Sequence, residues 1–185
     1  SEVEEIARRV DKLLKDNKRT VDEILKESRR LVKENNELVD KILREVEELL
    51  RRLEDEVRKE RDKDELTRKV KELIDRVRKL LEDLRRHSEE VRRRDEELAD
   101  RLRKHSKELE ERVKRLLEDL RRKSTSERVE KLLRELEKRV KESVDTSREV
   151  LKRSREDSKR SEDRTEKVLR EARKRVEDVA DKVRK

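Results

Sequence analysis

The sequence contains no glycine, proline, cysteine, methionine or aromatic residue. Sheet proteins rely on glycine, asparagine and proline for tight turns and on β-branched and aromatic residues for strands, so these absences disfavour a β fold. The lack of cysteine excludes disulfides, thiol catalysis and cysteine-based zinc sites. No apolar run approaches the roughly 18 residues of a membrane span, and the first residues lack a hydrophobic signal region. We therefore expect a soluble protein with no targeting signal and no membrane partner.

Charged residues make up 61% of the chain and hydrophobic residues 28%, mostly leucine and valine. Leucine, glutamate, lysine and arginine are good helix formers, and this composition is typical of long helices and coiled coils. Disorder is the competing interpretation of high charge. The 60 basic residues nearly cancel the 52 acidic ones, and the apolar residues recur periodically, which favours ordered helices. Because bases and acids alternate almost everywhere, we predict no nucleic-acid partner.

Apolar residues follow the helical period through the first third of the chain. They recur at steps near 3.5 residues at Val3, Ile6, Val10, Leu13, Ile24, Leu31, Leu38, Ile42, Val46, Leu49, Leu53 and Val57. This period predicts left-handed coiled-coil packing. A flanking column widens the stripe, as a helix touching two neighbours requires: Leu14, Val21, Leu25, Val32, Val39, Leu43 and Leu50. Similar stripes run through residues 66–120 and 129–183.

The stripe lapses twice, at Arg58–Glu65 and at Arg121–Arg128. Capping-box spacings predict helix starts near these breaks and at the N-terminus, in the pairs Ser1 with Glu4, Asp62 with Glu65 and Ser124 with Glu127. We predict helices at about 2–61, 64–122 and 126–184 in a single domain, 1–185. Short loops force antiparallel neighbours, so the expected fold is all-α, an elongated up-down-up three-helix bundle. One continuous helix in a fibrous coiled coil is the alternative, because no glycine or proline interrupts the chain.

A near-repeat links two parts of the second segment. Arg76–Ser88 reads RVRKLLEDLRRHS and Arg112–Ser124 reads RVKRLLEDLRRKS. With its surface of glutamate, lysine, arginine and aspartate, its matched helix lengths and its regular caps, the whole chain resembles de novo designed bundles built on parametric coiled-coil backbones. Natural spectrin-like triple helices usually carry aromatics, glycine and proline. The resemblance implies a recombinant scaffold without natural biochemical activity, enzymatic function, cofactor or native compartment.

Small polar residues interrupt the apolar stripes. They are Asn17, Thr20, Ser28, Asn35, His87, Ser88, Asp95, His105, Ser106, Ser143, Ser147, Ser154, Ser158, Ser161 and Thr165. In an up-down-up bundle, facing residues of the first two helices sum to about 125 and those of the last two to about 248. His105 then faces Thr20 and Ser143. Asp95 faces the neighbourhood of Ser28 and Ser154, and His87 faces that of Asn35 and Ser161. We therefore predict three buried polar layers.

Grouping these residues has a physical reason. A buried polar group without a partner costs about 1–3 kcal/mol, so matched layers penalise a slipped or swapped helix and specify register. His87 and His105 lie about 27 Å apart along a helix and cannot share a metal ion. His87 and Asp95 are about 12 Å apart, too far for a catalytic pair. We predict no metal site and no catalytic residues.

Two functions fit these observations. The first is a structural scaffold whose polar layers specify helix register. The alternative is an interaction module that homo-oligomerises or accepts an added, designed helix, with pH sensitivity through His87 and His105, since a neutral buried histidine resists protonation. The column from Leu14 to Val39 distinguishes them, because a monomer must bury it internally. The segment Lys152–Lys167, which has no apolar residue between its ends, is either the share of the third helix in the layers or a weak region that an added helix complements.

Overall fold

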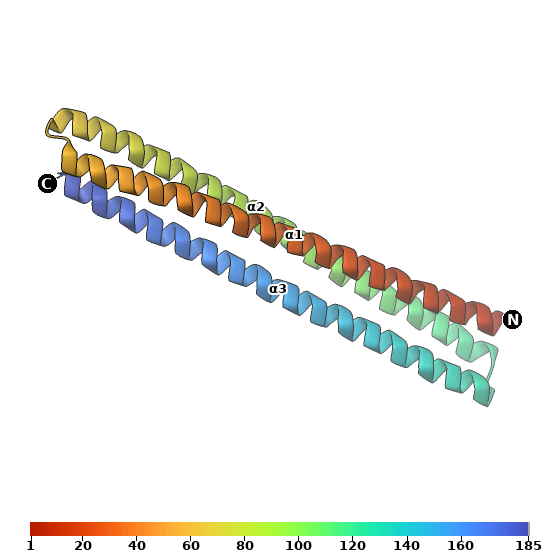
Figure 1. Ribbon diagram of the computed structural model, residues 1–185. Coiled ribbons are helices and arrows are strands. Elements are labelled where there is room, and N and C mark those ends of the chain that lie inside the picture. Colours follow the sequence, from red (N-terminus) through yellow and green to blue (C-terminus); the bar gives the residue numbers. More distant parts are fainter. Residues whose placement is uncertain (185) are drawn as a thin grey trace. The chain divides into compact units, whose positions relative to one another are not determined.

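The chain folds into three helices. The computed structural model describes residues 1–184, in which α1 spans Glu2–Lys59, α2 spans Lys63–Lys123 and α3 spans Glu127–Arg184. No strand occurs in this range, so the predicted all-α class is confirmed (Figure 1). Residues 60–62 and 124–126 separate the helices, and the alternative of one unbroken helix is therefore wrong.

Side-chain caps mark the helix starts. The amide nitrogen of Glu4 donates to Ser1 Oγ at 3.4 Å, and the amides of Asp64 and Glu65 donate to Asp62 Oδ1 at 3.0 and 3.3 Å. These bonds satisfy amides that have no partner within the first helical turn.

The cap of α3 differs from the prediction. Ser126 Oγ accepts from the amide of Val129 at 3.3 Å, so Ser126 caps this helix. Ser124 Oγ instead accepts from the amide of Ser126, which closes the turn before the helix. The capping-box spacing favoured Ser124, whereas the structure begins the helix at Glu127, directly after Ser126.

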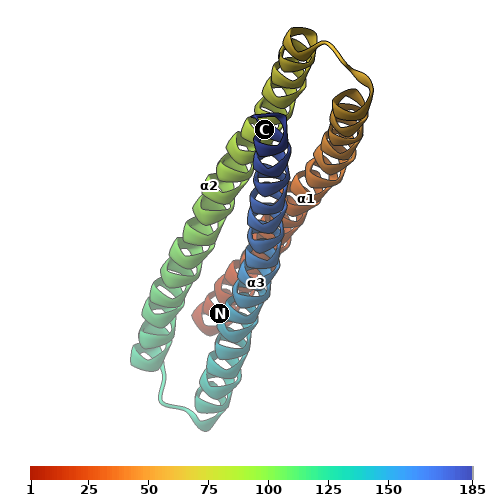
Figure 2. The ribbon, with the colours of Figure 1, turned by 90° about the vertical axis from the view of Figure 1, so that its left-hand side faces the viewer.

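Contacts between the helices group into two units. The first unit contains Ser1–Arg30 and Asp95–Glu156, and the second contains Leu31–Arg94 and 157–184. Each unit takes a segment from all three helices, with α2 antiparallel to α1 and α3. The loop between α1 and α2 belongs to the second unit and the loop between α2 and α3 to the first (Figure 2).

Each unit has its own apolar core. In the first unit, α1, α2 and α3 contribute Ile6, Val10, Leu14, Leu109, Val113, Leu117, Leu120, Val129, Leu133 and Leu136, with a smaller cluster at Val21, Ile24 and Leu102. In the second unit, the most deeply buried members are Val39, Val46, Leu50, Leu53, Val77, Leu84 and Val176. The helices pack pairwise, which makes the chain a three-helix bundle.

The flanking column that could have signalled a partner is covered by the chain itself. Leu14, Val21 and Val39 are buried, and Leu25 and Val32 are half-buried. No large hydrophobic residue is exposed in the described part of the chain. The widened stripe therefore serves contacts with two neighbouring helices.

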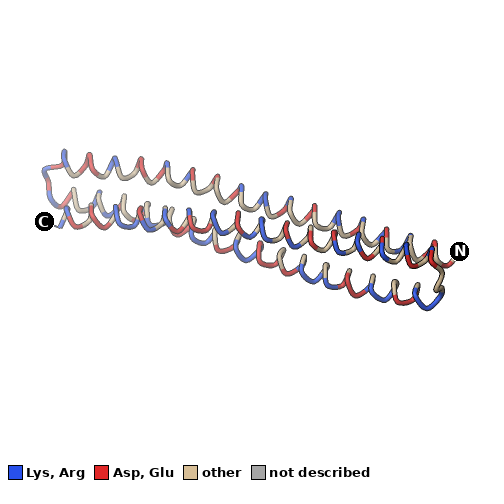
Figure 3. Tube along the Cα trace, turned by 90° about the horizontal axis from the view of Figure 1, so that it is seen from below, with Lys and Arg blue, Asp and Glu red and all other residues tan. Residues whose placement is uncertain are grey.

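Acidic and basic residues are interspersed along each helix (Figure 3). Most ion pairs join residues three or four apart on one helix. Arg85 bonds to Glu82 in this way and lowers the pKa of that carboxyl to about 2, while the Arg139 guanidinium lowers the pKa of Asp11 across the α1–α3 contact. Within residues 1–184, no helix has a window of 18 residues apolar enough to cross a bilayer.

Candidate functional site

The first polar layer joins all three helices around Asn17, whose side chain is 2% exposed. Asn17 Nδ2 donates to Ser143 Oγ at 3.1 Å and to Ser147 Oγ at 3.2 Å, and His105 Nδ1 lies 3.1 Å from Asn17 Oδ1. Ser147 Oγ donates its own hydrogen to the Ser143 carbonyl at 3.0 Å. We call Asn17, His105, Ser143 and Ser147 the Asn17 layer.

Hydrogen positions in this layer follow from its geometry. Because the Ser147 hydroxyl hydrogen points to a carbonyl, its oxygen must accept from Asn17, which fixes the orientation of the Asn17 amide. The Asn17 carbonyl oxygen then faces His105 and can only accept. Nδ1 of His105 must therefore carry a hydrogen.

The second layer is built on Ser28, Asp95 and Ser154, one from each helix, and we call it the Ser28 layer. Ser28 Oγ donates to Asp95 Oδ1 at 2.5 Å, and Ser28 Oγ lies 2.8 Å from Ser154 Oγ. The ionised carboxylate only accepts, so the Ser28 hydrogen is committed to it and Ser154 must donate to Ser28. Asp95 is 5% exposed, and a charge-assisted bond of this kind is stronger than a bond between neutral groups.

The third layer repeats the first with more bonds. Asn35 Nδ2 donates to Ser161 Oγ at 3.0 Å and to Thr165 Oγ1 at 3.1 Å. Asn35 Oδ1 accepts from Ser88 Oγ at 2.8 Å and faces His87 Nδ1 at 3.4 Å. Thr165 Oγ1 donates to the Ser161 carbonyl at 2.9 Å.

One member of this layer was missed by sequence reasoning. Ser161 Oγ donates to Asn36 Oδ1 at 2.9 Å, and Asn36 is half-buried. Asn36 lies outside the stripe; a second asparagine beside Asn35 was the only signal. The Asn35 layer is thus Asn35, Asn36, His87, Ser88, Ser161 and Thr165.

The Asn17 and Asn35 layers use one sequence rule. The four members of the Asn17 layer each have a counterpart 18 residues away in the Asn35 layer, as Asn17 has in Asn35 and His105 in His87. Eighteen residues are five turns of an α-helix, so each residue returns to the same helix face. The Ser143–Ser147 and Ser161–Thr165 pairs are spaced four apart, which brings both hydroxyls to one amide.

Some predicted members take no part in these bonds. Thr20 and Ser106 are half-buried and make no side-chain hydrogen bond within residues 1–184, and His105 bonds Asn17 rather than Thr20. Ser158 is half-buried on α3 and is not one of these unbonded side chains. In the described range, every buried side-chain nitrogen or oxygen has a hydrogen-bond partner.

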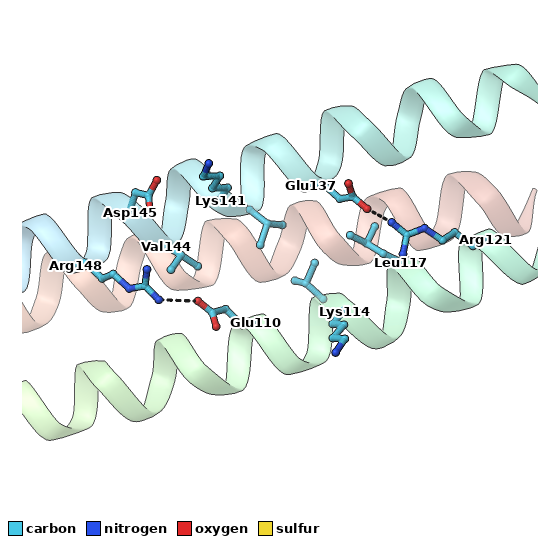
Figure 4. A pocket seen from close by; sticks show the side chains of 11 residues that line it. Glu110, Lys114, Leu117, Arg121, Glu137, Lys141, Val144, Asp145 and Arg148 are labelled. Atoms are coloured by element: carbon cyan, nitrogen blue, oxygen red, sulfur yellow. Dashed lines mark hydrogen bonds and ion pairs between the residues drawn. The ribbon is translucent and has the colours of Figure 1, made fainter.

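A hollow of about 390 Å³ lies between α2 and α3 in the first unit (Figure 4). Val113, Leu117, Val140 and Val144 supply its apolar surface. Two ion pairs cross it, one between Arg121 and Glu137 and one between Arg148 Nη2 and Glu110 Oε1 at 3.6 Å.

Most charged side chains of the hollow are paired or directed away from it. The side chains of Lys114 and Lys141 point out of the hollow in Figure 4, and four of its other charged side chains form the two opposite-sign pairs across it. Residues 1–184 contain no group of three or more histidine or carboxylate side chains placed to hold a metal ion. The three layers form directional hydrogen bonds between specific side chains of the three helices.

Comparison with known proteins bears on the fold. No protein-family model matches the sequence, and no curated protein matches it. Among solved structures, the chain is similar to a computationally designed three-helix bundle, with a TM-score of 0.74 and 18% sequence identity over 98% of this chain and 88% of that chain. A likeness at this identity identifies the three-helix bundle fold. The buried hydrogen-bond networks are a feature of the present structure itself.

Proposed function

We propose that this chain is a designed structural scaffold without enzymatic activity, in which the three polar layers determine which helix faces meet and in which register. The observation that carries the proposal is that every layer takes side chains from all three helices and that each of its bonds pairs a donor with an acceptor. The structural likeness to a designed bundle supports the designed origin, as do the near-repeat in α2 and the uniform surface composition.

The energetic argument concerns alternatives to the native packing. Sliding α3 by one heptad along α1 moves it about 10 Å and takes both hydroxyls away from Asn17. A buried amide without partners costs about 1–3 kcal/mol, and the shift that brings Thr146 beside Asp11 sets Val168 and Ala172 against Asn35, which removes both of its α3 acceptors. Apolar contacts alone tolerate such a shift, because leucine and valine recur with the heptad.

This role matters most for α1 and α3. Three-residue loops tie α1 to α2 and α2 to α3, whereas no loop joins α1 directly to α3. Asn17 and Asn35 both direct their two amide hydrogens to α3. The apolar-poor segment 152–167 supplies Ser154, Ser161 and Thr165 to these bonds, which favours its interpretation as the α3 share of the layers.

Thiol cross-linking tests the register role, and the chain has no natural cysteine to interfere. Asp11 and Arg139 face each other, with 2.6 Å between Asp11 Oδ1 and Arg139 Nη2. Because the long arginine side chain spans most of the gap between the two backbones, a short bifunctional thiol reagent replaces direct disulfide formation. The pair Asp11→Cys/Arg139→Cys then reports the native register, and Asp11→Cys/Thr146→Cys reports a shift of one heptad. With intact layers we expect only the first pair to cross-link.

The decisive comparison removes the layers. Asn17→Leu and Asn35→Leu are combined with leucine at both histidines and at Asp95 and with alanine at the bonded serines and valine at Thr165. In this background we expect the shifted pair to cross-link as well. Exclusive native cross-linking in the layer-free chain would show that loops and apolar packing suffice, and the proposed register role would fail.

The interaction-module alternative makes a different prediction about mass. A scaffold that covers its own apolar stripe should remain a monomer of 22.7 kDa. We expect light scattering at micromolar concentration to give this value at several dilutions. Two or three times that mass would favour self-association, and complex formation with a designed helix would favour an acceptor bundle.

A further inference from the structure

The groove between α1 and α2 in the first unit differs in charge from the other helix contacts. It encloses about 670 Å³. The half-buried Leu13 and Leu116 form its base and pack against the core of the unit. The remaining lining side chains are Arg9, Lys12, Arg112, Arg115, Asp16 and Asp119.

The two carboxylates do not neutralise the facing cations. Asp16 pairs with Arg19 on its own helix at 3.3 Å, and Asp119 pairs with Lys123 at 3.5 Å. Over the described range of the chain, Lys12, Arg112 and Arg115 make no ion pair. The groove therefore keeps an excess of positive charge contributed from both of its walls.

Other contacts between helices of this unit join opposite charges. Asp11 meets Arg139 between α1 and α3, and Glu110 meets Arg148 between α2 and α3. Like charges facing one another across a groove repel, and fields of one sign add in a concave site. Facing cations contribute nothing to the packing or stability of a bundle, so this groove is an exception among its helix contacts.

The near-repeat in α2 sharpens the contrast. Residues 112–119 correspond to 76–83, so the same α2 surface occurs once in each unit. Because the numbers of facing residues in α1 and α2 sum to about 125, residues 112–119 face residues 6–13, a segment with three bases and one acid. By the same rule, residues 76–83 face residues 42–49, a segment with three acids and one base. Only the first unit places a basic α1 face beside these α2 cations.

We propose that the groove is a binding site for a compact multivalent phosphate anion, such as inorganic tripolyphosphate. Arg112 and Arg115 are one turn apart on α2, and their guanidinium groups can each donate two hydrogen bonds to phosphate oxygens. Lys12 supplies an ammonium from the opposite wall. The bound anion relieves repulsion between the cations, and the half-buried leucines limit hydration at the base.

Titration calorimetry at about 10 mM ionic strength tests this site with tripolyphosphate, since screening of exposed charges is weak there. The site variant is Arg112→Gln/Arg115→Gln, and the control is Arg76→Gln/Lys79→Gln at the corresponding positions of the repeat. Each variant removes two positive charges from the net charge of +8, so the general attraction of the protein for anions falls equally. All four side chains are exposed, and circular dichroism verifies that both variants stay helical.

We expect saturable binding to the wild-type chain, a loss of about tenfold or more in the site variant and a change below about twofold in the control. Lys12→Gln should also weaken binding, because it belongs to the opposite wall. Equal losses in the site and control variants, or an unaffected Lys12→Gln variant, would overturn the proposal.

Two further ligands define what the groove recognises. Orthophosphate should bind more weakly than tripolyphosphate, because it engages fewer cations. Free oligophosphates and nucleotides share the triphosphate group, so adenosine triphosphate should bind about as well as tripolyphosphate. Binding of the nucleotide alone, or absence of saturable tripolyphosphate binding by the wild-type chain, would refute the oligophosphate site.

Discussion

His105 Nδ1 donates a hydrogen bond to Asn17 Oδ1 at 3.1 Å, and the second ring nitrogen takes no part in the Asn17 layer. The amide oxygen can only accept, so the bond needs a hydrogen on Nδ1. A second proton on Nε2 leaves that hydrogen in place, because both ring nitrogens of the imidazolium are donors. The geometry is therefore compatible with either charge state of His105.

We predict that the Asn17 layer persists when His105 is protonated. Nitrogen-15 NMR across pH 8 to 5 should show Nδ1 protonated throughout, with the Asn17 side-chain amide resonances retained at every pH. His105→Asn provides the control for assignment. Loss of the Asn17 amide signals in step with the titration would contradict this prediction and support a histidine-driven acid switch.

Asn35 should contribute more to stability than Asn17. Asn35 has four hydrogen-bond contacts, one of them from the Ser88 hydroxyl. The equivalent residue in the Asn17 layer is Ser106, which makes no side-chain hydrogen bond within residues 1–184. Since a hydrogen bond contributes about 1 kcal/mol, we expect Asn35→Ala to destabilise by about 1 kcal/mol more than Asn17→Ala. Urea unfolding followed by circular dichroism measures the difference.

Two matched controls accompany this comparison. Thr20→Ala and Ser106→Ala remove half-buried groups without a bond, so each should change the unfolding free energy by less than about 0.5 kcal/mol. A larger loss in either control than in Asn17→Ala would mean that the observed bonds do not determine the stability of the layer.

The sequence predicted which polar residues lie on the apolar stripes, and it predicted part of the pairing between them. Heptad spacing identified Asn17, Ser28 and Asn35 as inward-facing, and antiparallel numbering brought Asp95 to the neighbourhood of Ser28 and Ser154 without any coordinates. The sum rule fixes height along the bundle only to within about one helical turn. For that reason it set His105 beside Thr20, although Asn17, three residues away, forms the bond.

Other features depend on atomic detail that a periodic pattern does not contain. Asn36 lies off the stripe, yet its side chain reaches Ser161. The choice between Ser124 and Ser126 as the α3 cap depends on the path of a three-residue loop. The charge excess in the α1–α2 groove arises from which helix faces meet, so interleaved charges in the sequence concealed it.

The Ser28 layer should show that satisfied polar groups contribute to specificity more than to stability. Ser28→Ala removes the 2.5 Å bond to a buried carboxylate and should destabilise by about 1.5–3 kcal/mol. Replacing all members together, as Ser28→Ala/Asp95→Leu/Ser154→Ala, removes the desolvated charge along with its donors and should be nearly neutral or stabilising. Chemical denaturation of both variants measures these values. A triple variant less stable than Ser28→Ala would mean that the layer is itself a major source of stability.

Acid should weaken the bundle through surface carboxylates whose pKa values are lowered by neighbouring arginines. Hydrogen bonding to Arg85 lowers the pKa of Glu82 from 4.5 to about 2, so the folded state holds this proton less tightly than the unfolded chain. The contribution of Glu82 to the free energy of unfolding is complete above about pH 4.5 and is lost as the pH falls toward 2.

We expect Glu82→Gln to lose less stability than the wild-type chain between pH 5 and 2 in thermal melts. Glu47→Gln removes an exposed carboxylate without an ion pair in the described residues and should follow the wild-type profile. Because Glu82 is only half-buried, salt screens its charge, and the difference should shrink in about 1 M salt. Identical acid profiles for Glu82→Gln and Glu47→Gln at low salt would show that the Arg85 pair contributes nothing to the acid response.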